Sequence, residues 1–447
     1  MVKVYGKSAD QISSALQKGE VTIDLVGIGN MGLPVAVAFA KEGAKVVGVR
    51  TNQKVVDMIN RGDSPLIGEP NIPELLQEMV KAGKFRATTD GTAAANDSDV
   101  IILLVPLLVD EQGQEDYTII KSAANVAGKG LKKGDLVITS TTMPPGATET
   151  VIQPVLEAAS GLKAGKDFGL AHSPERLMVG RVVRNLYKFP KVVGGIDEAS
   201  TEAAAGVYGL FGDVVRTSSL LAAELVKVAE GTFRDVNIGY ANLLAQLCEP
   251  LGVDAWEVIA AANEGTREHC MIHRPSAGVG GHCIPVYPWF LINKAKELGI
   301  NSALLRQVRY LNDSMPFHTI ELVIRCLNAQ KKSINGSKVS LLGISFRADV
   351  KETRFAASLK ILKHLRDYHP DAILAYDPFF SKKEVTDLGF TPTTFEDALR
   401  ADCVIILAPH TEFQDAKTKL VAIEDRLIDT TNMLPHTPWK VGRIPST

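Results

Sequence analysis

The feature that most constrains the fold is an apolar run near the N-terminus that ends in glycines. Residues 21–29 read VTIDLVGIG, and the helical pattern LPVAVAFAKEG follows at 33–43. Such a run is typical of a buried strand in a parallel sheet. The pattern therefore predicts that the chain opens with an α/β domain in which a strand passes through a tight turn into a helix.

The same alternation of strand and helix patterns continues along most of the chain. Residues 9–19 have helical spacing, and strand-like runs follow at 44–50, 98–106, 135–141, 168–174 and 191–195. Long amphipathic segments replace strands from about 218 to 327, and strand-like runs return at 338–346, 372–379, 402–410 and 425–432. We therefore expect an α/β fold with two doubly wound, Rossmann-like domains, at 1–205 and 328–447, joined by a helical middle domain at 206–327.

Composition excludes several classes of protein. A chain of 447 residues with 45% hydrophobic and 22% charged residues is a globular protein too long for one ordinary core. A net charge of -2 gives no reason to expect nucleic-acid binding. The five cysteines are scattered and odd in number, which argues against a disulfide framework. Without a secretory h-region or an uninterrupted apolar run of ~18 residues, we expect a cytoplasmic protein with no membrane partner.

The glycine cluster after the first strand predicts a dinucleotide site. It reads Gly27, Ile28, Gly29, Asn30, Met31 and Gly32. Glycines between a strand and a helix permit a tight turn and let a pyrophosphate approach the helix N-terminus. NAD is the expected cofactor.

The end of the second strand leaves NADP open as the alternative cofactor. An acid normally stands here to bind the ribose hydroxyls, but this strand ends in Arg50, and Lys54 follows nearby. An arginine at this place is associated with a 2′-phosphate. The other interpretation is that Arg50 points into solvent.

A second glycine-rich stretch, GVGGHCIPVYPWF at 278–290, contains Cys283. Three roles are possible for this cysteine. A free cysteine often packs like a small hydrophobe, but packing alone does not need the glycines. A metal site would use His269, Cys270, His273, His282 and Cys283, whose spacing fits no standard zinc pattern. The third role is a covalent nucleophile beside a nicotinamide, which turns an aldehyde into a thioester and then an acid.

The order of six motifs identifies a known family. The motifs are GIGNMG, TTMPPG (141–146), SPER (173–176), AELVK (223–227), GVGGHCIPV (278–286) and LGISFR (342–347). Together they resemble the UDP-glucose/GDP-mannose 6-dehydrogenase family over essentially the whole chain. The segments at 59–76 and 173–180 look most like the branch that acts on UDP-N-acetylhexosamines, above all UDP-N-acetylmannosamine.

The resemblance implies an oxidoreductase that converts a sugar C6 alcohol into a uronic acid with two nicotinamide cofactors per turnover. It implies that Cys283 is the nucleophile and that Lys227 stabilises the oxyanion. Glu175 then matches the carboxylate of thioester hydrolysis, with Thr142 near the same water.

The resemblance also implies the binding residues. Arg354 matches a diphosphate contact, Arg234 lies near the sugar, and Arg267 reaches into a neighbouring subunit's site, which suggests a homodimer. The remaining expected contacts are Arg347 for the cofactor and Arg176, Gly278, Gly280, Tyr287 and Phe346 for the substrate.

Two departures from the family pattern lie on the chemistry. Four residues after Lys227 the family has asparagine and this chain has Gly231; four residues after Cys283 it has aspartate and this chain has Tyr287. Loss of such an amide typically costs ~3 kcal/mol of transition-state stabilisation. A nucleotide-sugar-binding protein with impaired catalysis is therefore the second hypothesis, and a two-electron dehydrogenase of the hydroxyacid type is the third.

Overall fold

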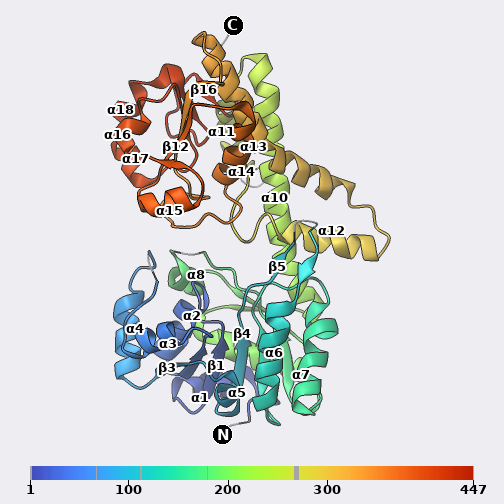
Figure 1. The fold of residues 1–447 in the computed structure, drawn as a ribbon. Helices are drawn as coiled ribbons and strands as arrows, with labels where there is room; N and C mark the ends of the chain where they lie inside the picture. The colour runs from blue at the N-terminus through green and yellow to red at the C-terminus, as the bar shows by residue number, and fades with distance from the viewer. Residues whose placement is uncertain (1–2, 67, 111–112, 179, 266–270, 446–447) are drawn as a thin grey trace. The chain divides into compact units, whose positions relative to one another are not determined.

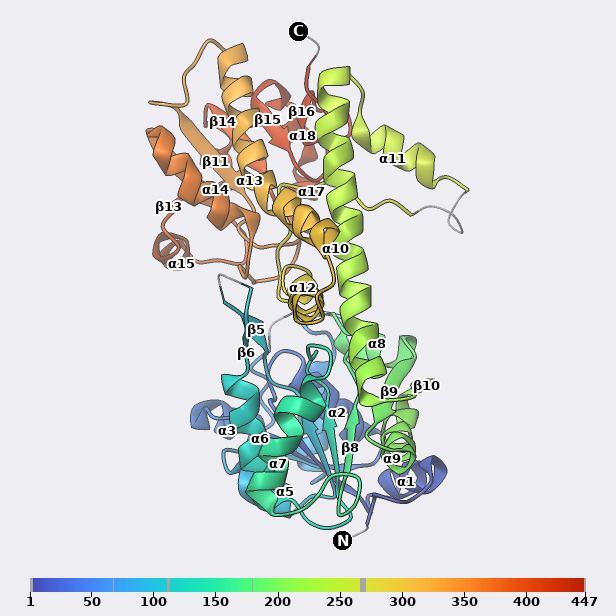
Figure 2. The same ribbon diagram turned by 90° about the vertical axis from the view of Figure 1, so that its right-hand side faces the viewer.

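The computed structural model describes residues 3–66, 68–110, 113–178, 180–265 and 271–445 (Figures 1 and 2). The chain divides into two compact units, Met1–Glu230 and Gly231–Thr447. The boundary falls inside one long helix, α10 (Leu220–Leu251), and most of the predicted helical region groups with the C-terminal α/β region. Within the described ranges no helix is long and apolar enough to cross a membrane.

The first unit is built on an eight-stranded sheet. In sheet order the strands are β10 (Val214–Arg216), β9 (Lys191–Gly195), β8 (Gly169–His172), β7 (Leu136–Thr139), β4 (Val100–Leu103), β1 (Thr22–Val26), β2 (Lys45–Val49) and β3 (Phe85–Thr88). The helices are α1 (Ala9–Gln17), α2 (Gly32–Lys41), α3 (Gln53–Asn60), α4 (Ile72–Lys81), α5 (Gly91–Asn96), α6 (Thr118–Gly130), α7 (Gln153–Ser160), α8 (Val182–Lys188) and α9 (Glu198–Tyr208). Helices α5, α6 and α7 cover one face, and α1, α8 and α9 lie on the other (Figure 2).

Strands β7 and β4 lie at the centre of this sheet and are buried. The strands predicted at 21–29, 44–50, 98–106, 135–141, 168–174 and 191–195 are confirmed, whereas β3 and β10 were not predicted. One pair breaks the parallel pattern: β9 runs antiparallel to β8, with Ala171 opposite Gly195 and His172 opposite Gly194. A short antiparallel hairpin, β5 (Leu108–Val109) with β6 (Glu115–Asp116), stands outside the main sheet.

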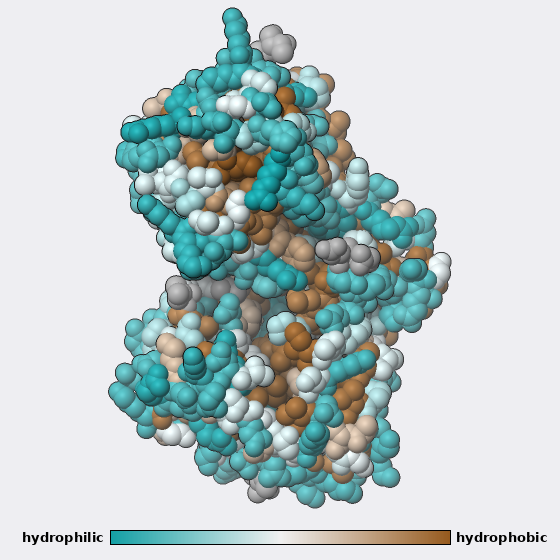
Figure 3. Space-filling view, viewed as in Figure 1, coloured by the Kyte–Doolittle hydropathy of each residue, from teal (hydrophilic) through white to brown (hydrophobic). Residues whose placement is uncertain are grey.

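The second unit combines helices with a six-stranded parallel sheet. The sheet order is β13 (Thr391–Pro392), β12 (Ala372–Tyr376), β11 (Lys338–Leu342), β14 (Cys403–Ile406), β15 (Leu427–Asp429) and β16 (Trp439–Lys440). The helices after α10 are α11 (Ala255–Asn263), α12 (Tyr287–Glu297), α13 (Ala303–Ala329), α14 (Ala357–Leu365), α15 (Lys382–Asp387), α16 (Phe395–Ala398), α17 (Thr411–Asp415) and α18 (Lys417–Val421). Both doubly wound sheets and the helical region between them are as expected. On the face in Figure 3, hydrophilic residues cover most of each unit.

A buried polar network joins the two longest helices of the second unit. Arg309 on α13 donates to Asp235 on α10 at 2.5 Å, and both side chains are almost fully buried. Asn312 donates to the same carboxylate oxygen at 2.9 Å and accepts from Asn242 at 2.9 Å. Because removing one partner of such a pair leaves a buried charge unpaired, this network fixes the pairing of α10 with α13.

The core of the first unit contains a carboxyl group, that of Asp24, without a hydrogen-bond partner. Asp24 lies in β1, is completely buried, and neither of its carboxyl oxygens has a hydrogen-bond partner. Burial raises the pKa of Asp24 well above its ordinary value, and the charge of Arg86 is the lesser influence, in the opposite direction. At neutral pH the folded chain therefore has to desolvate this carboxylate or hold a proton on it.

Replacing Asp24 with valine is expected to raise the free energy of unfolding of the first unit by about 1–3 kcal/mol at pH 8, because a buried unsatisfied group is removed. The pKa of Asp24 is higher in the folded than in the unfolded chain. Its penalty is thus absent below the unfolded pKa and grows as the pH rises toward the folded pKa.

Urea unfolding of wild type and Asp24→Val at pH 5 and pH 8 measures this difference, with Asp213→Val as an exposed control. The stabilisation should be larger at pH 8. A gain that is equal at the two pH values, or no gain, would contradict the assignment.

Candidate active site

The glycine cluster forms the turn that the sequence predicts. Gly27 has φ +108°, and a Cβ there would lie 2.2 Å from the Leu104 carbonyl oxygen. A Cβ on Gly32, at the start of α2, would lie 2.2 Å from the Gly27 oxygen. Beside Gly29, by contrast, there is nothing within 4 Å. The first and third glycines are thus required by packing, and the second leaves the helix N-terminus open to a ligand.

This arrangement fits NAD. A close-packed turn, an open glycine and the first amides of a ten-residue helix are what a pyrophosphate needs. Asn30 is exposed and Met31 half-buried beside the opening, while Ile28 is buried beneath it.

Arg50 has a role that neither sequence interpretation anticipated. Its guanidinium donates to the carbonyl oxygen of Ile28 at 2.9 Å, so it joins the end of β2 to the glycine turn. It is half-buried rather than pointing freely into solvent. Lys54 is exposed in the first turn of α3. The hydrogen bond to Ile28 gives this arginine a structural role that does not require a 2′-phosphate.

The loop that contains Thr142 follows β7 and is held by a carboxylate of α10. Glu224 is fully buried and accepts the amides of Gly146 at 2.5 Å and Thr148 at 2.8 Å. Burial raises the pKa of Glu224, and these hydrogen bonds act in the opposite direction. The loop is therefore fixed to the helix that carries Lys227.

Glu175 lies just beyond β8 in a buried, charged environment. Its amide donates to the Ser140 oxygen at 3.4 Å, and its side chain is 8% exposed. Neither carboxylate oxygen has a hydrogen-bond partner of standard geometry. Burial raises the pKa of Glu175, while the charges of Lys191 and then Lys227 lower it. The structure therefore places two of the predicted catalytic residues, Glu175 and Lys227, in electrostatic contact.

Arg176, the residue after Glu175, has its guanidinium committed within the first unit. It forms a two-pronged ion pair with Glu230 of α10 and donates to the Pro190 oxygen at 3.2 Å. Such a planar pair fixes geometry as well as charge. The expected contact of Arg176 with the substrate stays a prediction. Its ion pair with Glu230 joins the SPER segment to α10.

The cysteine loop is held from two sides within the second unit. Asn237 of α10 accepts from the His273 amide and donates to the Met271 oxygen, both at 2.7 Å. On the other side, the Gly281 amide donates to the Arg354 oxygen at 2.8 Å. Cys283 follows as an exposed free thiol just before α12, so the core-packing role is wrong.

Two of the loop glycines are required by close packing. A Cβ on Gly280 would lie 2.6 Å from Cβ of Phe346, and Gly281, with φ +90°, faces the same ring at 2.9 Å. Gly278 has φ +145° and is in ordinary contact with Pro316 and Ala357. The cysteine is therefore presented on backbone that lies directly against the loop of residues 343–356.

Residues 343–356, which follow β11, contain Arg354, the expected diphosphate contact, and Arg347, the expected cofactor contact. Asp377 at the end of β12 accepts the amides of Ile344 at 2.8 Å and Ser345 at 3.1 Å, and lies 3.1 Å from Nε2 of His410. Nδ1 of His410 accepts the Asp349 amide at 2.9 Å, which assigns the proton to Nε2. This pair positions the loop.

The loop also shows backbone strain and a poorly satisfied guanidinium. Asp349 and Phe355 have positive φ of 56° and 52°, which non-glycine residues rarely adopt. Arg354 stacks over the Phe355 ring at 4.6 Å, and its buried Nε has no hydrogen-bond partner. Arg347 lies over Phe346 at 5.7 Å. These features suit a loop that binds an anion.

Two further arginines were predicted. Arg234 is exposed on α10. Arg267 lies outside the described residues.

The two departures from the family pattern contact each other. A Cβ on Gly231 would lie 2.5 Å from Cδ2 of Tyr287 and 3.3 Å from its Cβ and Cγ. The Tyr287 ring is buried and occupies the space that a side chain at 231 would fill. The tyrosine at 287 thus requires the glycine at 231, and the two replacements form one steric unit.

A metal site at the cysteine loop has no support among the residues that the structure describes, because no three His, Cys, Asp or Glu side chains there are placed to hold an ion. His269 and Cys270 lie outside those residues.

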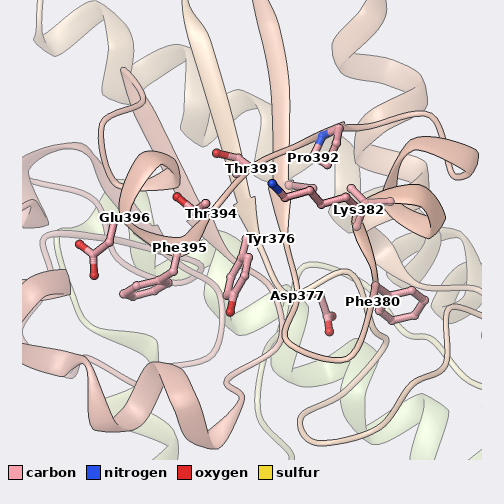
Figure 4. A pocket seen from close by; sticks show the side chains of 11 residues that line it. Tyr376, Asp377, Phe380, Lys382, Pro392, Thr393, Thr394, Phe395 and Glu396 are labelled. Carbon is pink, nitrogen blue, oxygen red and sulfur yellow. The ribbon is translucent and has the colours of Figure 1, made fainter.

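A pocket of about 390 Å³ opens at the carboxyl ends of β12 and β13, outside the predicted site (Figure 4). The Tyr376 ring lies between Phe395 and Lys382, and Thr393 and Thr394 line the same pocket. Burial raises the pKa of Tyr376, and its hydrogen bond to Glu412 at 2.7 Å acts in the same direction. None of the predicted substrate residues lines this pocket.

Three consecutive family models match the chain. They are the NAD-binding domain (residues 21–212), the central domain (221–314) and the UDP-binding domain (340–436) of the UDP-glucose/GDP-mannose dehydrogenase family. The chain belongs to this family. It is therefore an NAD-dependent nucleotide-sugar dehydrogenase, and a UDP-sugar is its class of substrate.

Named relatives cover nearly the whole chain. It is 33% identical to an NDP-N-acetyl-D-galactosaminuronic acid dehydrogenase of Ralstonia nicotianae, over 95% of this chain and 97% of that protein. It is 33% identical to a UDP-N-acetyl-D-mannosamine dehydrogenase of Escherichia coli K12, over 88% and 94%. A solved UDP-D-ManNAc dehydrogenase structure from Pyrococcus horikoshii matches with a TM-score of 0.85 and 31% identity, over 94% and 99%.

Several residues of the site escaped the sequence analysis. Glu224 lies inside the AELVK motif and Glu230 just beyond it. One sequence does not show that Glu224 accepts buried backbone amides or that Glu230 pairs with Arg176. Lys191 begins a predicted strand, and the residues next to it in the sequence do not indicate that its side chain is buried near Glu175. Asp377 lies near the end of one predicted strand and His410 at the end of another, and this position is the one signal that would have suggested a site at that edge.

The steric unit predicts strong coupling between positions 231 and 287. Gly231→Asn alone should lower the stability of the second unit, because the new side chain collides with the tyrosine ring. In Gly231→Asn/Tyr287→Asp the collision is gone, so the two changes together should cost about 1–3 kcal/mol less than the sum of the single changes.

Denaturant unfolding of the four proteins in this cycle measures the coupling, with Ala229→Asn as an exposed control on the same helix. Additive costs would show that the two positions are independent.

Proposed function

We propose that the protein oxidises C6 of a UDP-N-acetylhexosamine, namely UDP-N-acetylmannosamine, to the uronic acid in two NAD-dependent steps through a thioester on Cys283. The observation that supports this most is the exposed Cys283 thiol on a glycine loop bound to the UDP-binding region by the Gly281–Arg354 hydrogen bond. The substrate is inferred from relatives whose names specify N-acetylhexosamine derivatives.

The glycine turn (Gly27, Gly29 and Gly32) would hold NAD, and two NAD molecules bound in succession would supply the oxidant, each taking up one hydride, the first from the alcohol, whose proton passes to water, and the second from the thiohemiacetal. Between these events the Cys283 thiolate adds to the aldehyde carbon and forms a C–S bond. Lys227 stabilises the negative oxygen of that adduct. In the last step Glu175 takes a proton from water, the hydroxyl adds to the thioester carbon, and the C–S bond breaks to release the uronate and the thiolate.

The Gly231–Tyr287 unit favours a second candidate, a nucleotide-sugar-binding protein with little turnover. Tyr287 fills the place of an amide side chain but is a poor base, since a phenol has a pKa near ~10. In the active-enzyme account its ring instead packs against the sugar or donates a hydrogen bond to it.

Absorbance at 340 nm separates the two candidates. Wild type should form two NADH per UDP-N-acetylmannosamine, with lower kcat/KM for UDP-N-acetylglucosamine and UDP-glucose. Cys283→Ala should lose at least 1000-fold in rate and still bind the sugar nucleotide.

The control is Cys248→Ala, at a buried cysteine far along α10. No NADH from any of the three sugars, with binding retained, would favour the binding protein. One NADH per sugar would contradict the thioester route.

We also propose that the protein is a homodimer that associates through α10. Phe233, Tyr240 and Leu247 recur every seven residues and are 69%, 50% and 51% exposed. Leu243 and Leu251 extend the same stripe and are also exposed. A repeated apolar stripe of this kind on one helix is typical of helix-to-helix association.

The double variant Tyr240→Glu/Leu247→Glu should dissociate the dimer, because two charges enter the apolar stripe of each copy. Light scattering should then give a mass near the 48.2 kDa of one chain instead of twice that value. Tyr368→Glu, outside the stripe, should remain dimeric. A wild type of single-chain mass would contradict the proposal.

A further inference from the structure

Lys191 is a buried cation that the reaction as described does not use. It is the first residue of β9, its side chain is 3% exposed, and its Nζ has no hydrogen-bond partner. A lysine is almost never buried in this way without a compensating charge. A carboxylate near Lys191 is therefore expected to provide that charge.

The register of strands β8 and β9 identifies this carboxylate. Strands β8 and β9 pair antiparallel with Ala171 opposite Gly195 and His172 opposite Gly194. Continued along the chain, this register sets Glu175 opposite Lys191. The Arg176 guanidinium reaches the Pro190 oxygen at 3.2 Å, so the two segments still run side by side beyond the last strand pair.

Glu175 and Lys191 therefore face each other as two buried opposite charges. Both carboxylate oxygens and the ammonium nitrogen lack hydrogen-bond partners of standard geometry. Such groups compensate each other electrostatically even without direct contact, because the field between them is poorly screened in the interior.

The other groups around Glu175 do not replace Lys191. Tyr208 of α9 carries no positive charge: burial raises its pKa well above the ordinary value, its hydroxyl lies 2.6 Å from Oγ of Ser140, and it lowers the pKa of Glu175 less than either lysine does. Arg176 is paired with Glu230. Lys227 of α10 has a weaker effect on Glu175 than Lys191 has. Lys191 is thus the principal cation for this carboxylate.

We propose that Lys191 is a positioning residue of thioester hydrolysis, which keeps Glu175 in its charged, proton-accepting form. This assignment rests on the proposed function, in which Glu175 takes the proton of the attacking water. Lys191 itself touches no reacting atom. Its contribution is to let a carboxylate buried next to the chemistry act as a base at neutral pH.

The pH profile of Lys191→Met tests this role. Without the cation the pKa of Glu175 rises further, so the acidic limb of kcat should move up by about one pH unit or more. On that limb the rate should fall about tenfold. Stopped-flow traces should then show a burst of NADH before a slow steady state, because hydrolysis has become limiting, with KM for the sugar nucleotide unchanged.

Three further variants make the result decisive. Lys191→Arg should restore the wild-type limb, and Lys191→Gln should shift it as methionine does, which serves if Lys191→Met does not fold. Lys188→Met, at an exposed lysine of α8, should change nothing. A merely structural lysine would lower melting temperature or NAD affinity without moving the limb.

The two proposals fail in different ways. Wild type that forms no NADH overturns the proposed function, and this role with it. Wild type that forms two NADH per sugar, together with unshifted limbs in Lys191→Met and Lys191→Gln, overturns the role of Lys191 alone.

Discussion

The first unit's part of the site depends on the Glu224 carboxylate, which accepts the amides of Gly146 and Thr148. This one side chain fixes the loop after β7, with Thr142, to helix α10. Lys227 lies three residues further along the same helix and so on a neighbouring position of the same face. Two elements that are distant in sequence are joined by a buried anion whose negative charge is satisfied by backbone amides rather than by a cation.

Buried charge is a recurring feature of this chain, and its partners decide what each group can do. Asp235 is matched by Arg309 at 2.5 Å and stabilises the pairing of two helices. Glu175 is matched more loosely, by the charges of Lys191 and Lys227, and its buried oxygens form no hydrogen bond of standard geometry. Asp24 has no hydrogen-bond partner, and burial raises its pKa well above the ordinary value. Only the second arrangement suits a group that must exchange protons.

The sequence predicted much of the fold because its signals are local. The glycine turn, the central strands and the helical region follow from periodicity and from glycine positions. Strands β3 and β10 escaped because they are short, mixed in polarity and lie on the outer part of the sheet. The antiparallel β8–β9 pair also escaped, although it is this register that sets Lys191 against Glu175.

The site residues divide in the same way. Cys283 and the glycines around it were found from one short motif, whereas the hydrogen bond from Arg50 to the Ile28 oxygen was not predicted. The replacements at 231 and 287 looked like two separate losses in the sequence. Only their contact in space shows that the tyrosine ring occupies the room that the glycine leaves. Long-range contacts of this kind have no trace in one sequence.

The most direct test of the account is to trap the covalent intermediate. Glu175→Gln should still form NADH with UDP-N-acetylmannosamine but hydrolyse the thioester slowly, so that intact-mass and peptide analysis should find the acyl group on Cys283. Full NADH formation without an adduct, or an adduct on another cysteine, would contradict the account.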